Sequence, residues 1–209
     1  MTGRRPIRVL TVDDHPLIRE GIATVIRSQP DLELVGQASD GKDSIQLFRE
    51  FRPDVTLMDL RLPDIDGVDA MSSIRAEFPS AKIIILTTFE GDAEARRALQ
   101  AGAFGYLLKT MPPNELVEAI RQVQAGRKRV APEIGKSFAE YFSTESLTER
   151  EVSVLKQVAQ GNGNREIGRL LTISEETVKA HIKRIMEKLD AGDRTEAVTI
   201  AIRRGIIHL

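Results

Sequence analysis

The chain has 209 residues, of which 41% are hydrophobic and 29% charged, and its formal net charge is −1 at pH 7. This apolar fraction is enough to build one large core or two small ones, which excludes a disordered polymer. Because the chain contains no cysteine, a disulfide framework and a thiolate metal site are also excluded.

The charge is unevenly distributed along the chain. Residues 1–125 carry 15 Lys/Arg and 19 Asp/Glu, whereas residues 126–209 carry 15 and 12. An acidic first part and a basic second part indicate two modules with different partners. The apolar run Ile7–Val12 is too short for a signal peptide, and no segment approaches the roughly 18–20 apolar residues of a membrane span. We therefore expect a soluble cytoplasmic protein.

Residues 1–125 alternate short apolar runs with amphipathic segments. The runs are continuous rather than alternating, which is typical of parallel strands covered on both faces. Five such units with short connections predict an α/β doubly wound, five-stranded parallel sheet whose strands all end at one edge. The expected strands are Ile7–Val12, Leu32–Ala38, Val55–Met58, Lys82–Thr87 and Phe104–Leu108.

Residues 126–145 are charged and contain glycine and proline, so we expect a linker there. Residues 146–209 then have an all-helical pattern. Thr148 and Glu151 form a capping box that opens the first of these helices. The expected helices that follow are Asn164–Leu171, Glu175–Leu189 and Thr195–Arg204.

Five polar side chains are placed where predicted strands end. Asp13 and Asp14 follow the first strand, Asp59 follows the third, Thr87 ends the fourth and Lys109 follows the fifth. One acid in such a position is usually a cap or a solvated loop residue, but five at the ligand-binding edge of an open sheet indicate a site. Three carboxylates repel one another unless a cation lies among them, and hard oxygen ligands of this kind suit Mg²⁺.

Asp59 can then act as a nucleophile towards phosphorus and form an acyl phosphate. Lys109 would pair with a phosphoryl oxygen and Thr87 would donate a hydrogen bond to it. Because neither a Walker A loop nor a GxGxxG motif is present, the phosphoryl donor must be small or another protein.

These residues, together with YLLK at 106–109, resemble the receiver domain of two-component response regulators, which has a flavodoxin-like fold. The resemblance implies that Asp59 receives its phosphoryl group from a sensor histidine kinase. It also implies that Thr87 and Tyr106 form a switch, although Tyr106 also fits an ordinary strand aromatic. The implied Mg²⁺ ligands are Asp13, Asp14, Asp59 and the backbone carbonyl of Arg61. Lys109-Thr110 departs from the Lys-Pro pair that many receivers have.

Two weaker signals in this region favour structural roles. Asp64 and Asp66 superficially resemble metal-binding motifs, but the spacing is wrong and we expect a solvated turn. His15 is expected in the first turn of a helix, and without other His or Cys ligands it is a poor metal site.

The helix Glu175–Leu189 has one apolar face and one basic face. Residues at one side form an apolar stripe, namely Val178, Ile182, Ile185, Met186 and Leu189. The opposite side carries Lys179, Ala180, Lys183 and Arg184. A short helix, a three-residue turn and a longer basic helix make a helix-turn-helix, whose second helix can enter the major groove of DNA.

The segments LTEREVSVL, NREIGRLL, ISEETVKAHI and KLDAGDRTEAV resemble the LuxR-type output domain of the NarL/FixJ response regulators. The resemblance implies that Lys179, Ala180 and Lys183 face base edges, with Arg184 beside them. Thr177, His181 and Arg194 are expected to make DNA-backbone or scaffold contacts. Gly168 stands where this type usually has alanine, and a helix-interior glycine costs around 1 kcal/mol, which predicts a less stable scaffold helix.

The combined prediction is a phosphorylation-dependent transcriptional regulator that binds double-stranded promoter DNA. It is expected to form a homodimer on activation, with the last helix as the seam, and to have no enzymatic activity beyond phosphoryl transfer to Asp59 and its hydrolysis. Three alternatives stay open: an aspartyl-phosphate phosphatase, which would need an acid/base that is not evident, a constitutive DNA-binding protein with a vestigial receiver, and a protein-binding adaptor.

Overall fold

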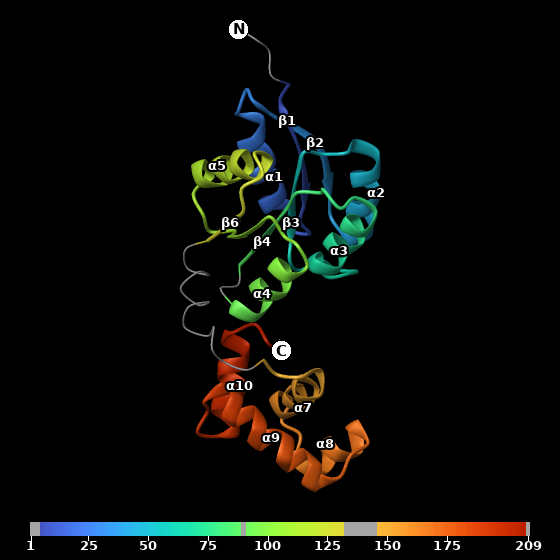
Figure 1. Ribbon diagram of the computed structural model, residues 1–209, viewed down its shortest axis with the longest axis vertical. Coiled ribbons are helices and arrows are strands. Elements are labelled where there is room, and N and C mark those ends of the chain that lie inside the picture. Colours follow the sequence, from blue (N-terminus) through green and yellow to red (C-terminus); the bar gives the residue numbers. More distant parts are fainter. Residues whose placement is uncertain (1–4, 89–90, 132–145, 208–209) are drawn as a thin grey trace. The chain divides into compact units, whose positions relative to one another are not determined.

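The computed structural model describes residues 5–88, 91–131 and 146–207. The chain folds into two compact units, an α/β unit and an all-α unit (Figure 1). No helix among the described residues is both long and apolar enough to cross a membrane.

The α/β unit contains a fully parallel sheet in the order β2-β1-β3-β4-β5-β6. All residues of β3, β4 and β5 are buried, as expected for strands covered on both faces. The strands are β1 (Ile7–Val12), β2 (Leu32–Ala38), β3 (Val55–Asp59), β4 (Ile83–Thr87), β5 (Gly105–Leu108) and β6 (Arg129–Val130).

The sixth strand corrects the prediction of five. Arg129 and Val130 pair in parallel with Gly105 and Tyr106 at the edge of the sheet, inside the segment expected to be a linker. Two strand residues in a charged context leave no apolar run for a sequence pattern to detect. The rest of the expected linker, residues 132–145, lies outside the described residues.

Helices cover both faces of the sheet. Helices α1 and α5 pack against each other on one face, while α2 and α3 pack together on the other (Figure 1). Asp40 caps α2, because its carboxylate accepts the N–H of Asp43 at 2.8 Å. The helices are α1 (Pro16–Arg27), α2 (Gly41–Phe51), α3 (Gly67–Glu77), α4 (Asp92–Gln100) and α5 (Pro113–Gln124).

The all-α unit has its own hydrophobic core. The predicted capping box is confirmed: the N–H of Thr148 donates to the Glu151 carboxylate at 2.8 Å, and the N–H of Glu151 donates to the Thr148 hydroxyl at 3.3 Å. Val178, Ile185 and Leu189 are buried, which confirms the predicted apolar stripe. The helices are α7 (Glu149–Ala159), α8 (Asn164–Leu171), α9 (Glu175–Leu189) and α10 (Arg194–Arg203).

Gly168 lies where α8 meets the turn that leads into α9. A Cβ at this position would lie 2.7 Å from the backbone carbonyl oxygen of Ile173, closer than Cβ atoms come to other atoms. The N–H of Ile173 also donates to the carbonyl of Gly168 at 2.9 Å. The glycine therefore permits the close approach of helix and turn, which offsets its unfavourable helix propensity.

Candidate functional site

The parallel register of the sheet brings the predicted site residues to one edge. Asp59 pairs with Leu86, and Thr87, the next residue of β4, pairs with Leu108 of β5. On the other side of β3, Val12 pairs with Met58, so that Asp13 follows directly beside Asp59. Asp13, Asp59 and Thr87 thus lie at the same edge of the sheet, as expected from the ends of the predicted strands.

Lys109 bridges two buried carboxylates. Its Nζ lies 2.7 Å from Oδ2 of Asp13 and 2.8 Å from Oδ2 of Asp59, and all three side chains are almost completely buried. The backbone N–H of Lys109 donates to the carbonyl of Thr87 at 2.7 Å, which fixes the start of the loop after β5. A single ammonium thus faces two carboxylates, and this inner part of the site carries a net negative charge.

The pKa of Asp59 is raised, chiefly because its carboxyl is buried. Burial raises the pKa of this carboxyl, Lys109 opposes the rise, and the neighbouring charge of Asp13 adds to it. The N–H of Arg61 donates to Oδ1 of Asp59 at 3.3 Å. A further positive charge at this edge would stabilise the ionised, nucleophilic form of Asp59.

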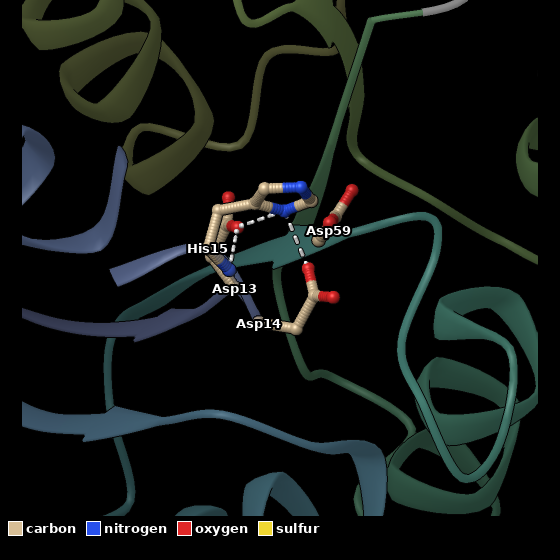
Figure 2. Close-up of side chains that lie close together, drawn as sticks. All are labelled: Asp13, Asp14, His15 and Asp59. Atoms are coloured by element: carbon tan, nitrogen blue, oxygen red, sulfur yellow. Dashed lines mark hydrogen bonds and ion pairs between the residues drawn. The ribbon is translucent and has the colours of Figure 1, made fainter. Parts of the chain in front are cut away.

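A cation would find its ligands already close together. Asp13, Asp14, His15 and Asp59 each offer one ligand atom, and these atoms lie within 4.8 Å of one another (Figure 2). Asp14 is partly exposed, so it can reach an ion from the solvent side. The three carboxylates therefore fit a small, hard divalent cation. Arg61 contacts Asp59 through its N–H, and ligation by its carbonyl stays a prediction.

Two further residues contact the site that sequence reasoning did not assign to it. His15 donates its backbone N–H to Oδ1 of Asp13 at 2.9 Å, and its Nδ1 lies 2.6 Å from Oδ1 of Asp14. Arg19 donates from its guanidinium to the carbonyl oxygen of Asp13 at 2.5 Å. His15 is the N-cap of α1, one residue before the first turn expected for it, and Arg19 lies in that first turn. Their position directly after an Asp-Asp pair was the available signal.

Thr87 and Tyr106 occupy adjacent strands. Thr87 is the last residue of β4 and is 1% exposed, whereas Tyr106 pairs with Ile85 and is completely buried. The tyrosine thus has its side chain inside the unit. This position fits both the switch and the ordinary strand aromatic, so the switch stays a prediction.

Asp64 and Asp66 are more than the solvated turn expected for them. Asp64 is exposed, yet its carboxylate accepts the N–H groups of Gly41 at 2.8 Å and Lys42 at 3.0 Å, at the N-terminus of α2. Burial alone would raise the pKa of Asp64, but its hydrogen bonds with backbone N–H groups together outweigh burial and lower that pKa. Asp66 caps α3 by accepting the N–H of Val68 at 2.8 Å. The loop after Asp59 is therefore held by helix caps at two places.

The basic face of α9 is exposed. Lys179 lies 3.2 Å from Glu175 and 3.7 Å from Glu176, and Lys183 lies 3.9 Å from Glu187. Exposed ion pairs within one helix are weak, so both lysines can exchange their partners for phosphates or base edges. The other exposed residues predicted for this face are Ala180 and Arg184.

Thr177, His181 and Arg194 lie at the margins of this face. The N–H of Thr177 donates to the Ser174 hydroxyl at 3.0 Å, and its own hydroxyl lies 2.9 Å from that oxygen, so it belongs to the N-cap of α9. Arg194 donates to the backbone carbonyl of Asn162 at 3.1 Å, which ties α10 to the α7–α8 loop. His181 is half-buried. The hydrogen bonds of Thr177 and Arg194 hold the all-α unit together, which fits the scaffold role expected for them.

Comparison with known families agrees with both parts of the chain. Residues 9–121 match the family described as response regulator receiver domain, and residues 145–201 match the family described as bacterial regulatory proteins, luxR family. The chain belongs to the response regulators of the NarL/LuxR type, which join a receiver domain to a LuxR-type helix-turn-helix domain.

Relatives are similar over almost the whole chain. The uncharacterized transcriptional regulatory protein YxjL of Bacillus subtilis (strain 168) is 42% identical, with 97% of this chain and 98% of that protein covered. The transcriptional regulatory protein LiaR of the same organism is 40% identical, with 97% and 100% covered. Among solved structures, a complex of the response regulator RcsB with DNA has a TM-score of 0.71 at 25% identity, with 95% and 99% of the chains covered. The protein is accordingly a transcriptional response regulator.

Proposed function

We propose that Asp59 accepts a phosphoryl group from a sensor histidine kinase in the presence of Mg²⁺, and that this modification controls binding of α9 to promoter DNA. The bridge from Lys109 to Asp13 and Asp59 at the buried edge of the sheet is the observation that carries the proposal. Such a bridge orients the acceptor carboxylate and supplies an ammonium where phosphoryl charge develops.

The residues at this edge have distinct roles in the proposed transfer. Asp13, Asp14, Asp59 and the Arg61 carbonyl would hold Mg²⁺, which when bound neutralises phosphoryl charge. Lys109 would move from its carboxylate partners to a phosphoryl oxygen, since its Nζ is already within 2.8 Å of Asp59. Thr87 would donate its hydroxyl to another of these oxygens.

Phosphorylation would change the charge balance at a site that is already acidic. It adds roughly −1.5 to −2 charges, by analogy with phosphoserine, beside buried Asp13. That charge favours an arrangement in which Thr87 turns towards the phosphoryl group and Tyr106 fills the space behind it. The two side chains form the proposed bistable element.

The proposed output is dimerisation and DNA binding. Lys179, Ala180 and Lys183 would face base edges in the major groove, with α10 as the dimer seam. A two-fold dimer would bind two half-sites about one helical turn apart. The likeness to a DNA-bound response regulator supports this arrangement of α9.

Acetyl phosphate serves as a small phosphoryl donor that tests the site. The full-length protein is incubated with acetyl phosphate and Mg²⁺, and the modified peptide is identified by mass spectrometry. Modification is expected at Asp59 and is expected to disappear in Asp59→Asn but not in Asp69→Asn, a control acid that is exposed on α3. Label retained in Asp59→Asn would contradict the assignment, and continuous turnover of a phosphomonoester would favour a phosphatase.

A further inference from the structure

The imidazole of His15 points into the cluster of carboxylates. Its Nδ1 lies 2.6 Å from Oδ1 of Asp14 and 3.4 Å from Oδ1 of Asp13. Figure 2 shows the ring turned towards the three acids rather than away from them. No other His or Cys accompanies His15 in the sequence, which made it a poor candidate for a metal ligand, but the ligands near it in the structure are carboxylates.

The spacing of the ligand atoms suits a single ion. In a tetrahedral ion with metal–ligand bonds of about 2.0–2.2 Å, the ligand atoms lie about 3.3–3.6 Å from one another. The ligand atoms of Asp13, Asp14, His15 and Asp59 lie within 4.8 Å of one another, so side-chain movements that close the widest separation by at most about 1.5 Å would complete the coordination. The His15 side chain is 64% exposed, which leaves its ring free to make such a shift.

Lys109 does not compete with His15 for the same oxygens. The ammonium contacts Oδ2 of Asp13 and Asp59, whereas the imidazole faces Oδ1 of Asp13 and Asp14. The two cationic or donor groups therefore approach Asp13 from different sides. An ion bound beside His15 leaves the Lys109 bridge in place.

We propose that this site also binds a borderline divalent cation, such as Zn²⁺ or Co²⁺, with His15 Nδ1 as the fourth ligand. Mg²⁺ prefers oxygen and binds without the imidazole, whereas Zn²⁺ and Co²⁺ accept nitrogen readily. Four protein ligands satisfy a tetrahedral ion, so an ion bound in this way competes with Mg²⁺ and leaves no position for a phosphoryl oxygen. The inference rests on the proposed Mg²⁺ site, because the two ions share the same carboxylates.

Cobalt is a suitable probe because it reports its ligands. The full-length, metal-free protein is titrated with Co²⁺ alone and with Mg²⁺ alone by calorimetry, and the Co²⁺ form is examined by proton NMR for a paramagnetically shifted, exchangeable imidazole N–H. His15→Ala is expected to weaken Co²⁺ binding about tenfold or more and to remove the shifted resonance. Binding of Mg²⁺ is expected to change less than about twofold, since a hard ion does not use the imidazole. His181→Ala, a matched histidine on α9, is expected to change neither affinity.

Two results would overturn the proposal. Equal losses of Co²⁺ and Mg²⁺ affinity in His15→Ala would mean that His15 only positions Asp14, and no loss of either would mean that it is not a ligand. Asp14→Asn separates this inference from the proposed function. If the wild type fails to bind Mg²⁺, or binds it equally well after Asp14→Asn, the proposed Mg²⁺ site is wrong, whatever His15→Ala does to Co²⁺.

Discussion

Glu151 ties the start of α7 to the end of α9 in the DNA-binding unit. Its buried carboxylate accepts the N–H of Thr148 at 2.8 Å and lies 3.0 Å from Nζ of Lys188. The substitution Glu151→Ala removes both contacts, including the ion pair of the Lys188 ammonium, whose side chain is only 13% exposed. We expect this change to destabilise the unit strongly without touching the receiver.

The expected loss follows from two terms. Loss of the cap costs about 0.5–2 kcal/mol, and removing one partner of a buried ion pair costs about 3–5 kcal/mol. Lys188 keeps the carbonyl of Ser146 at 3.3 Å and some contact with solvent, which reduces the second term. We therefore expect Glu151→Ala to lower the free energy of unfolding of the unit by about 2–4 kcal/mol.

The pH dependence of this contribution has a definite sign. Burial alone would raise the pKa of Glu151, but the N–H of Thr148 and the ammonium of Lys188 hold it below its ordinary value of 4.5. A depressed folded-state pKa stabilises the fold above the unfolded-state value and loses this effect as the pH falls through the folded-state value. The difference between wild type and Glu151→Ala should therefore be full at neutral pH and shrink below about pH 4.5.

Hydrogen exchange of the full-length protein measures the two units separately. Peptides from α7 and α9 report the loss, and peptides from the receiver sheet serve as the internal reference. Glu151→Gln, which keeps an acceptor for the Thr148 N–H, is expected to lose less than Glu151→Ala. The double variant Glu151→Met with Lys188→Met should recover part of the loss, because it replaces both members of the ion pair with apolar side chains. If the protection of α7 in Glu151→Ala stays within about 0.5 kcal/mol of wild type, the contacts of Glu151 do not stabilise the unit as proposed.

Three further substitutions test other parts of the structure. Asp64→Ala should lower the protection of α2 against hydrogen exchange by about 0.5–2 kcal/mol, because it removes the acceptor of the Gly41 and Lys42 N–H groups and leaves only the Asp40 cap; unchanged exchange would contradict this role. Gly168→Val should destabilise the DNA-binding unit by about 1–3 kcal/mol in the same assay, since its Cβ would meet the Ile173 carbonyl, whereas Gly163→Ala has open space and should cost less. Lys183→Ala should weaken DNA binding and flatten its log–log salt dependence by about 0.9 if the lysine contacts a phosphate, whereas a nearly unchanged slope with relaxed specificity would assign it to a base.

The sheet and its edge could be predicted because burial leaves a direct trace in sequence. Strands covered on both faces are continuous apolar runs, and Asp59 and Thr87 mark the C-terminal ends of two of those strands. β6 could not be predicted, because its pairing with β5 comes from its position after α5 and not from its own residues.

Contacts between distant loops account for the rest of what sequence did not reveal. Asp64 caps a helix that begins 23 residues earlier in the chain. Its neighbours in the sequence show only an acid in a turn. His15 has no other His or Cys beside it, and only the fold brings Asp59 of β3 to the ring and to the adjacent Asp13 and Asp14. The low helix propensity of glycine predicts that Gly168 destabilises its helix, but the Ile173 carbonyl lies too close for any residue with a Cβ.

In the proposed function, the acidic edge of the receiver controls the DNA-binding domain. A DNA duplex is first selected from a random pool by the full-length protein with beryllofluoride and Mg²⁺, which mimic the phosphorylated state. The affinity of the full-length protein for this duplex is then measured with and without beryllofluoride and Mg²⁺. We expect beryllofluoride to tighten DNA binding by the wild-type protein and to leave the DNA affinity of Asp59→Asn unchanged. Equal affinity of the wild-type protein in both conditions would contradict the proposed function and would indicate a constitutive DNA-binding protein.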